Sequence, residues 1–387
     1  MIPAHPAFAD GPLYLDYNAT TPVDPRVAEA MEPYLARWFG NPSSGHAYGA
    51  EPKQALERAR RQVAALIGAR PDEIVFTGSG SEADNLAIRG AVLAAETDRP
   101  HVITQITEHP AVLETCRALE RLHGADVTYL PVDHHGLVDP QDLAAAFTPR
   151  TVLVSVMAAN NETGALQPVS ELARIARAHG ALFHCDAAQA AGKIPLDVTA
   201  SGVDLMTVVG HKMYAPKGIA ALYVRTGVTL EPLVYGGGQE RGLRAGTENV
   251  ALATALGTAA QLAADDVADG DHHRIRALRD HLHSRLAAAL PGRVHLNGPA
   301  EPRLPNTLNV SIGGVRGHEL LAAIPEIAAS TGSACHSGAH TPSPVLSAMG
   351  LDNDRSLAAL RLSLGRWSTP DDINRAADLL IAASGTT

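Results

Sequence analysis

The sequence lacks the features that would assign it to several specialised classes of protein. It contains 3 cysteines in 387 residues, widely spaced and without a CxxC pair, so we predict neither a disulfide framework nor a metal site of the zinc type. It has no apolar run of membrane-spanning length. The segment 1–10 lacks the basic start and long apolar stretch of a secretory signal. We therefore expect a cytoplasmic protein without membrane contact.

Positive charge is also scarce. The chain has 31 Lys and Arg residues against 41 Asp and Glu residues, which gives a net charge of −10. A broad binding surface for nucleic acid is therefore not expected. The sequence contains no internal repeat or low-complexity linker. With 45% hydrophobic residues over this length, the chain can bury a large core and is expected to form about two domains.

Short β-branched segments alternate with longer helical patterns, an order that predicts an α/β fold with a mostly parallel sheet. Strands are predicted at 74–77, 101–104, 151–156, 181–185, 205–209 and 219–224, with helices at 82–95, 109–123 and 169–179. Helices at 251–268 and 271–290 and strands at 308–312 and 358–364 predict a smaller α+β domain. We place the large domain at 16–255 and the small domain at 1–15 plus 256–387.

An acid and a lysine stand at the ends of two predicted strands. Asp186, in Asp186-Ala-Ala-Gln189, could pair with a protonated pyridine nitrogen, although an isolated Asp here is more often a helix N-cap. Lys212, in Gly210-His-Lys212, could form a Schiff base, although most lysines simply lie at the surface. Together the two residues are typical of pyridoxal phosphate (PLP) chemistry.

Two glycine-rich segments add to this interpretation. The segment 76–82 joins a strand to a helix, where free N–H groups and the helix dipole can hold a phosphate, although most such segments are only turns. The segment 330–338 carries Cys335 among small residues that leave a thiolate accessible, although a structural cysteine is the alternative. Cys185 and Cys116 are interpreted as small hydrophobic residues without a function.

These motifs occur in an order that resembles the PLP-dependent cysteine desulfurases of the class V aminotransferase group. The resemblance rests on Leu15-Asp-Tyr-Asn-Ala-Thr-Thr-Pro22, Gly40-Asn-Pro-Ser-Ser44, Thr107-Glu-His109, Asn160-Asn-Glu-Thr-Gly164, Asp186-Ala-Ala-Gln189, Gly210-His-Lys212, Gly236-Gly-Gly-Gln-Glu-Arg241, Gly246-Thr-Glu-Asn249 and Leu362-Ser-Leu-Gly365. It covers most of the chain. It implies a PLP-dependent transferase of fold type I, in which the small domain carries the catalytic cysteine loop.

The resemblance also implies a role for each matching residue. The cofactor-binding set is Gly80, Ser81, His109, Asn161, Asp186, Gln189, His211, Lys212 and Thr247. In this set Lys212 joins the cofactor covalently, and Asp186 pairs with the ring nitrogen. Asn161 and Gln189 bond the ring oxygen.

The phosphate would be held by Gly80, Ser81 and His211, with Thr247 reaching in from a second subunit. The role of Thr247 implies a homodimer. His109 would stack on the cofactor ring and serve in proton transfer. Arg361 would clamp the substrate carboxylate by a bidentate pair, its alternative being a surface ion pair.

The implied activity is cysteine desulfurase. L-cysteine would become L-alanine, and its sulfur would stay on Cys335 as a persulfide before passing to an acceptor protein. Iron–sulfur cluster assembly, tRNA thiolation, DNA modification and sulfur-containing metabolites all remain open as destinations of that sulfur.

Some residues depart from the desulfurase pattern. Val209 stands where Ser or Thr often donates to the phosphate, so one hydrogen bond is expected to be missing or replaced. The sequence around Cys335-His336 and Pro342-Ser-Pro-Val-Leu346 is similar to selenocysteine lyases, which makes L-selenocysteine the alternative substrate. Another PLP reaction, such as transamination, and a non-catalytic sulfur-carrier scaffold are the remaining hypotheses.

Overall fold

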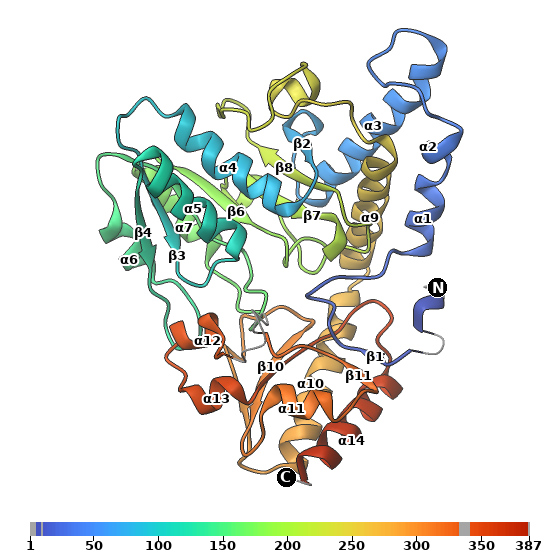
Figure 1. The fold of residues 1–387 in the computed structure, drawn as a ribbon, viewed down its shortest axis with the longest axis vertical. Coiled ribbons are helices and arrows are strands. Elements are labelled where there is room, and N and C mark those ends of the chain that lie inside the picture. Colours follow the sequence, from blue (N-terminus) through green and yellow to red (C-terminus); the bar gives the residue numbers. More distant parts are fainter. Residues whose placement is uncertain (1–4, 9–10, 333–340, 386–387) are drawn as a thin grey trace.

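The computed structural model describes residues 5–8, 11–332 and 341–385. A seven-stranded sheet organises the larger part of the molecule, with strand order β2-β8-β7-β6-β5-β3-β4 (Figure 1). Its strands are β2 (Ile74–Thr77), β3 (His101–Gln105), β4 (Asp126–Leu130), β5 (Thr151–Ser155), β6 (Leu182–Asp186), β7 (Leu205–Val209) and β8 (Ala220–Val224). Only β8 runs antiparallel to its neighbours. The predicted α/β class with a mostly parallel sheet is therefore confirmed.

Helices cover both faces of this sheet. The helices of this part are α1 (Pro25–Met31), α2 (Pro33–Ala36), α3 (Ala47–Leu66), α4 (Gly80–Ala94), α5 (Pro110–His123), α6 (Pro140–Ala146), α7 (Val169–Ala178), α8 (Val198–Ser201) and α9 (Val250–Ala268). Apolar residues of α4 and α5 share one core cluster with the sheet, whereas α3, α7 and α9 pack on the other face. All five residues of β7 are buried, as expected for a parallel strand that is covered on both sides.

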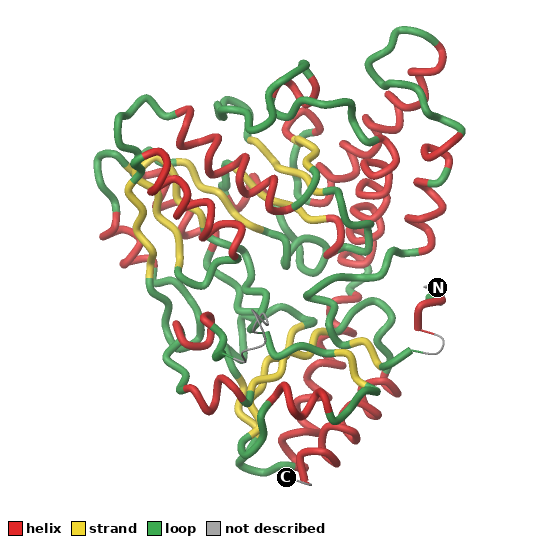
Figure 2. Tube along the Cα trace, in the orientation of Figure 1, coloured by secondary structure: helices red, strands yellow, loops and turns green. Residues whose placement is uncertain are grey.

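A smaller α+β part lies beside the first (Figure 2). Its antiparallel sheet has the order β12-β10-β9, and a separate parallel pair joins β1 to β11. Its elements are β1 (Leu13–Tyr14), α10 (Asp271–Ala289), β9 (Val294–Leu296), β10 (Thr307–Ile312), α11 (Gly317–Ala322), β11 (Ile327–Ala328), α12 (Pro344–Ala348), α13 (Asn353–Leu357), β12 (Ala359–Ser363) and α14 (Pro370–Gly385). Short 3₁₀ turns at Pro6–Phe8, Pro71–Glu73, Gly210–Lys212 and Gln239–Gly242 complete the chain.

The N-terminal segment belongs to both parts. β1 pairs with β11 in the smaller part, whereas the backbone N–H of Thr21 donates to the carbonyl of His211 in the larger part. In Figure 1 this blue segment passes between the two parts. The domain junction placed at residue 255 falls within α9, and the exact boundary stays a prediction.

The strands and helices for which a range was predicted begin and end within two residues of the predicted positions, whereas several helices, among them α3 and α14, had no predicted range. Sequence patterns did not identify β4, whose first four residues are only half-buried, nor the short strands β1, β9 and β11. Such short or edge strands carry little hydrophobic periodicity. In the described ranges, no helix has both the length and the apolar character to cross a membrane.

Candidate active site

A cavity of about 570 Å³ lies where the sheet of the larger part faces the smaller part. Its walls include the carboxyl ends of parallel strands, where α/β proteins commonly bind ligands. The lining residues are Asn18, Ala19, Ser79, Gly80, Ser81, Asp84, His109, Met157, Ala159, Asn161, Asp186, Ala188, Gln189, Val209, His211, Lys212, Lys217, Gly218, Ile219, Ser330, Gly332 and Arg361. The cavity therefore brings together all the predicted site residues except Thr247 and Cys335.

The first turn of α4 forms one wall of the cavity. Ser79 caps this helix by accepting the N–H of Glu82 at 3.1 Å. A Cβ at Gly80 would lie 2.6 Å from Cγ2 of Val209, so only glycine permits this close approach of helix to strand. The first N–H groups of a helix have no partner within the helix and favour an anion. This wall suits a phosphate, and Val209 contributes an apolar contact there.

His211 lies beside this wall. Its Nδ1 is 3.1 Å from the hydroxyl of Thr20. Burial, followed by the charge of Lys212, lowers the pKa of His211 to about 4. The ring is therefore neutral at pH 7, so it could bind an anion as a hydrogen-bond donor but not as a fixed charge.

Asp186 is the carboxylate at the end of β6, and its Oδ1 accepts the N–H of Ala188 at 2.8 Å. Burial raises the pKa of Asp186, but the bond from Ala188 and the nearby side chains of His109 and Lys212 lower it. The neighbouring carboxyls of Asp84 and Glu108 have pKa values raised well above normal by burial and then by the charge of Asp186. In this group we assign the negative charge to Asp186, because it has the compensating partners.

His109 stands at the start of α5, where its Nδ1 accepts the N–H of Ala111 at 3.1 Å. This bond places the ring proton on Nε2. Burial lowers the pKa of His109, although Asp186 partly offsets that effect. The ring is thus held as a neutral imidazole at the cavity wall.

Lys212 follows β7 on a 3₁₀ turn. Its Nζ donates to the backbone carbonyls of Asn18 and Ala19, each at 2.7 Å. Burial and then the charge of Arg361 lower the pKa of Lys212 to about 8. An amine in this range is a better nucleophile at neutral pH than an ordinary surface lysine.

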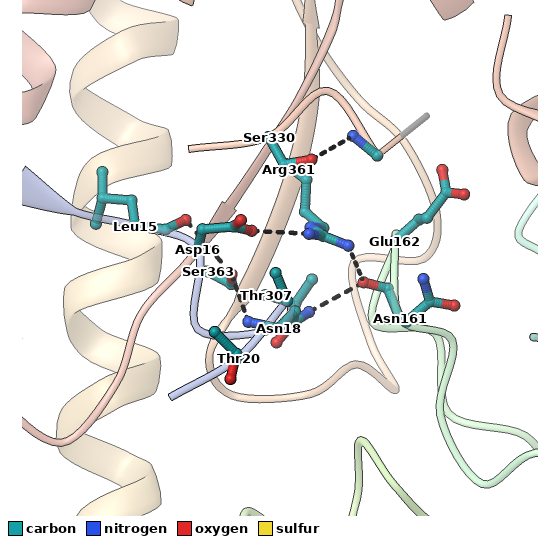
Figure 3. Close-up of polar contacts among 12 residues, drawn as sticks. Leu15, Asp16, Asn18, Thr20, Asn161, Glu162, Thr307, Ser330, Arg361 and Ser363 are labelled. Atoms are coloured by element: carbon teal, nitrogen blue, oxygen red, sulfur yellow. Dashed lines mark hydrogen bonds and ion pairs between the residues drawn. The ribbon is translucent and has the colours of Figure 1, made fainter. Parts of the chain in front are cut away.

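Arg361, on β12, reaches the same cavity from the smaller part. Its Nη2 donates to Oδ1 of Asp16 at 2.7 Å, and its Nη1 donates to the carbonyl of Asn161 at 3.3 Å. Figure 3 shows these three residues in a row across the junction. The buried Nε of Arg361 has no partner in the described part of the chain. Arg361 is therefore held toward the cavity with donors to spare for a carboxylate.

Two amide side chains face the cavity from separate segments. Gln189 donates from Nε2 to the carbonyl of Asn18 at 3.0 Å and accepts at Oε1 from Nζ of Lys193 at 2.8 Å. Within the described residues, no hydrogen bond occupies the side-chain amide of Asn161. Both amides are therefore available to a ring oxygen, Asn161 completely and Gln189 through its second N–H.

Two predicted site residues lie apart from this group. Thr247 is exposed and does not line the cavity. Cys335 lies outside the described residues. The described residues on either side of it meet one carboxylate: a Cβ at Gly332 would lie 2.7 Å from Oε2 of Glu162, and the hydroxyl of Ser343 donates to that oxygen at 2.6 Å.

Sequence reasoning assigned no role to three residues that hold this site together, Asp16, Asn18 and Lys193. Asp16 and Asn18 do lie in the motif Leu15–Pro22, but their contacts with β10, β12 and the lysines arise only in the tertiary structure. Lys193 follows Gln189 by one helical spacing, the only local signal that the two side chains meet.

Comparison with known proteins identifies the family of the chain. The aminotransferase class-V family matches residues 13–376. The mitochondrial cysteine desulfurase of Drosophila melanogaster is 49% identical over 96% of this chain and 80% of its own length. A solved NifS-like protein superposes with a TM-score of 0.90 at 36% identity, covering 97% of this chain and all of the other. SspA in complex with cysteine superposes with a TM-score of 0.80 at 35% identity, covering 92% of this chain and 99% of the other.

These relatives favour cysteine desulfurase over selenocysteine lyase, so the first of the sequence-based hypotheses is confirmed at the level of the family. The chain belongs to the aminotransferase class-V family and, within it, to the cysteine desulfurases.

Proposed function

We propose that this protein is a PLP-dependent cysteine desulfurase that converts L-cysteine to L-alanine and retains the sulfur on Cys335 as a persulfide. One observation carries the proposal: a single cavity holds an amine of lowered pKa, a buried carboxylate and an arginine with free donors, on Lys212, Asp186 and Arg361. The SspA structure, which contains cysteine, supports the choice of substrate.

The donor set of the cavity fits PLP. The first turn of α4, with Gly80 and Ser81, suits the phosphate, and the carboxylate of Asp186 suits the protonated ring nitrogen. The free amide of Asn161 and the second N–H of Gln189 suit the ring oxygen. When bound, the cofactor supplies an electron sink that stabilises negative charge on the substrate α-carbon.

The remaining tasks belong to the chain itself. Arg361 binds and orients the substrate carboxylate through its unused donors. Lys212 moves the α-proton at Nζ, because two backbone carbonyls take two of its N–H groups and leave its third position for proton transfer. His109, held neutral, presents its ring to the cofactor side of the cavity.

The sulfur step is assigned to Cys335. Its thiolate forms an S–S bond with the substrate sulfur as the Cβ–S bond breaks, and the released electron pair takes up a proton to give alanine. An acceptor thiolate then attacks the outer sulfur of the persulfide, the S–S bond breaks, and its electron pair restores the Cys335 thiolate; an external thiol reductant can regenerate the thiolate in the same way. We propose a protein as the acceptor, because a persulfide is passed on by direct thiol attack.

A homodimer completes the proposal. Leu35, Phe39, Tyr48 and Tyr235 are large apolar side chains that remain exposed in one subunit, and such groups commonly mark an interface. Thr247 is exposed as well, which suits a residue that serves the cavity of a second copy. Sedimentation of the holoenzyme should give the mass of two chains of 40.4 kDa; a monomer that retains full activity would overturn this part.

The activity is tested by measuring alanine release from L-cysteine and from L-selenocysteine. The parent should release alanine from cysteine, and Cys335→Ala should lose this activity while still binding PLP. Turnover confined to selenocysteine would instead make the protein a selenocysteine lyase. Equal cysteine turnover by Cys335→Ala would remove the persulfide from the mechanism.

A further inference from the structure

The side-chain amide of Gln189 is fixed from both ends. Its Nε2 donates to the carbonyl of Asn18 at 3.0 Å, and its Oε1 accepts from Nζ of Lys193 at 2.8 Å. A carbonyl can only accept, so the nitrogen must face Asn18 and the oxygen must face Lys193. The second hydrogen of Nε2 is left for the cavity that Gln189 lines.

Lys193 is placed to act only as a donor. Besides Gln189, its Nζ faces Oδ1 of Asn18 at 3.5 Å, so both neighbours are oxygen acceptors. The turn after β6 sets this geometry: the N–H groups of Lys193 and Ile194 both donate to the carbonyl of Ala190. This backbone arrangement puts residues four apart on one side of the turn.

Asn18 provides the rigid end of this arrangement. Its Nδ2 donates to the carbonyl of Asn161 at 3.1 Å and to the hydroxyl of Thr307 at 2.9 Å, and its Oδ1 accepts from Asn306 at 2.9 Å. The close-up of this region shows Asn18 linked to Asn161 in this way (Figure 3). The carbonyl of Asn18 therefore has a fixed position when Gln189 donates to it.

We propose that Lys193 is a positioning residue that fixes the carboxamide of Gln189 with its free N–H directed at the ring oxygen of the cofactor. The inference rests on the proposed PLP function of the cavity. Without the Lys193 contact, only the bond to Asn18 orients the amide, and rotation about the last side-chain bond can remove the free N–H from the cavity.

The position of Lys193 has no other evident structural use. Among the ion pairs of the described residues, none includes Lys193. Burial, and then the charges of Lys212 and Arg361, lower the pKa of Lys193 well below normal, so a lysine is an unfavourable residue here unless its N–H groups are needed. The hydrogen-bond partners of its Nζ, Asn18 and Gln189, are both residues of the cavity wall.

The test is a double-mutant cycle on cofactor affinity. Gln189→Ala, Lys193→Met and the double variant are prepared without cofactor and titrated with PLP, and binding is followed by the visible absorbance of the bound cofactor. Each single variant should bind PLP about fivefold more weakly, the effect of one hydrogen bond. In the Gln189→Ala background, Lys193→Met should change the affinity no further.

The second readout is the pH midpoint of the visible absorbance change of the bound cofactor. Loss of a donor to the ring oxygen should move that midpoint in the same direction for Gln189→Ala and Lys193→Met, and the double variant should match the single variants. Lys193→Arg keeps a donor and should restore the parental midpoint. Additive effects in the cycle, or a Lys193→Met variant identical to the parent, would overturn the proposal.

Two controls separate this result from other causes. Lys53→Met makes the same chemical change at an exposed position of α3 and should leave both readouts unchanged. If Lys193→Met does not fold, Lys193→Leu carries the same cycle with a shorter side chain that also lacks a donor. If the parent protein itself fails to bind PLP, the proposed function fails, and that outcome is distinct from an additive cycle in a protein that does bind it.

Discussion

Asp16 and Arg361 form an ion pair of 2.7 Å between the N-terminal segment and β12, at the wall of the cavity. The same guanidinium is assigned to the substrate carboxylate, so in the free protein a carboxylate of the chain already occupies one of its donors. On this assignment, the substrate carboxylate must share Arg361 with Asp16 or displace Asp16 from it.

We expect Asp16→Asn to lower the KM for cysteine three- to tenfold with little change in kcat. The Asn side chain still offers Arg361 an acceptor oxygen, but it lacks the charge that competes with the substrate carboxylate. A change of about 1 kcal/mol in the free energy of substrate binding gives a fold-change in this range. Steady-state kinetics with cysteine measure it.

Asp204→Asn is the matched control for Asp16→Asn. It removes an ion pair of 2.6 Å with Arg225 away from the cavity. Both variants should lose about 1 to 3 kcal/mol of unfolding free energy, but only Asp16→Asn should change KM. A higher KM in Asp16→Asn would show that the charge of Asp16 helps to present Arg361 to the substrate.

The lowered pKa of Lys212 determines how the rate of PLP uptake should depend on pH. Its pKa is lowered to about 8, first by burial and then by Arg361, so in the cofactor-free protein the amine is mostly neutral only above that pH. The rate at which added PLP joins Lys212 should rise with pH through about 8. Arg361→Gln should move the midpoint upward because it removes the cation that lowers the pKa. A midpoint near 10.5 in the parent would contradict the lowered pKa.

The buried carboxyl of Glu162 should make the unfolding free energy depend on pH with the opposite sign to that of most carboxylates. Burial raises the pKa of Glu162 to about 7, so between its unfolded value and pH 7 the folded state binds more protons than the unfolded state. Its contribution therefore falls as pH rises through this range. Relative to the parent, Glu162→Gln should gain about 1 to 3 kcal/mol of unfolding free energy between pH 5 and pH 8. Denaturant titrations at both values test this, and a constant difference would refute it.

Replacing Val209 by a residue with a hydroxyl group should increase the affinity for PLP. It lines the cavity against Gly80, where a hydroxyl could reach the phosphate. We expect Val209→Thr to bind PLP about three- to fivefold more tightly, the effect of one added hydrogen bond. Val208→Thr is the control, because Val208 faces the core and its variant should lose stability without a gain in affinity. Equal affinities of Val209→Thr and the parent would show that the phosphate lies elsewhere.

Local patterns in the sequence predicted most of the strands and some of the helices. The buried strand β7 and the amphipathic helix α7 appear as predicted. Burial on both faces gives β7 a continuous apolar run, and one buried face gives α7 a helical period. β4 was not predicted, since its edge position leaves it half-buried. The motifs also correctly predicted that Asp186 and Lys212 line one cavity. Asp186 ends β6 and Lys212 follows the neighbouring strand β7, so both lie at the same edge of the sheet.

The contacts that hold Arg361 and Asn18 in place at the site could not be predicted from the sequence. Asp16 meets Arg361 across 345 positions of sequence, and Asn18 meets Thr307 across 289. Such pairs depend on how the two parts pack, which no local period encodes. Thr247 and Cys335 keep the roles that the family resemblance implies, as predictions.

The pairing of β1 with β11 also sets the order in which the protein can be completed on the ribosome. Leu13 is made about 300 residues before its partner Ile327. At typical rates of elongation the first strand waits about 15 to 60 seconds for its partner. During this time the nascent chain can present Asp186 and Lys212 but not Arg361, so an unfinished polypeptide has the residues assigned to the cofactor without the residue assigned to the substrate.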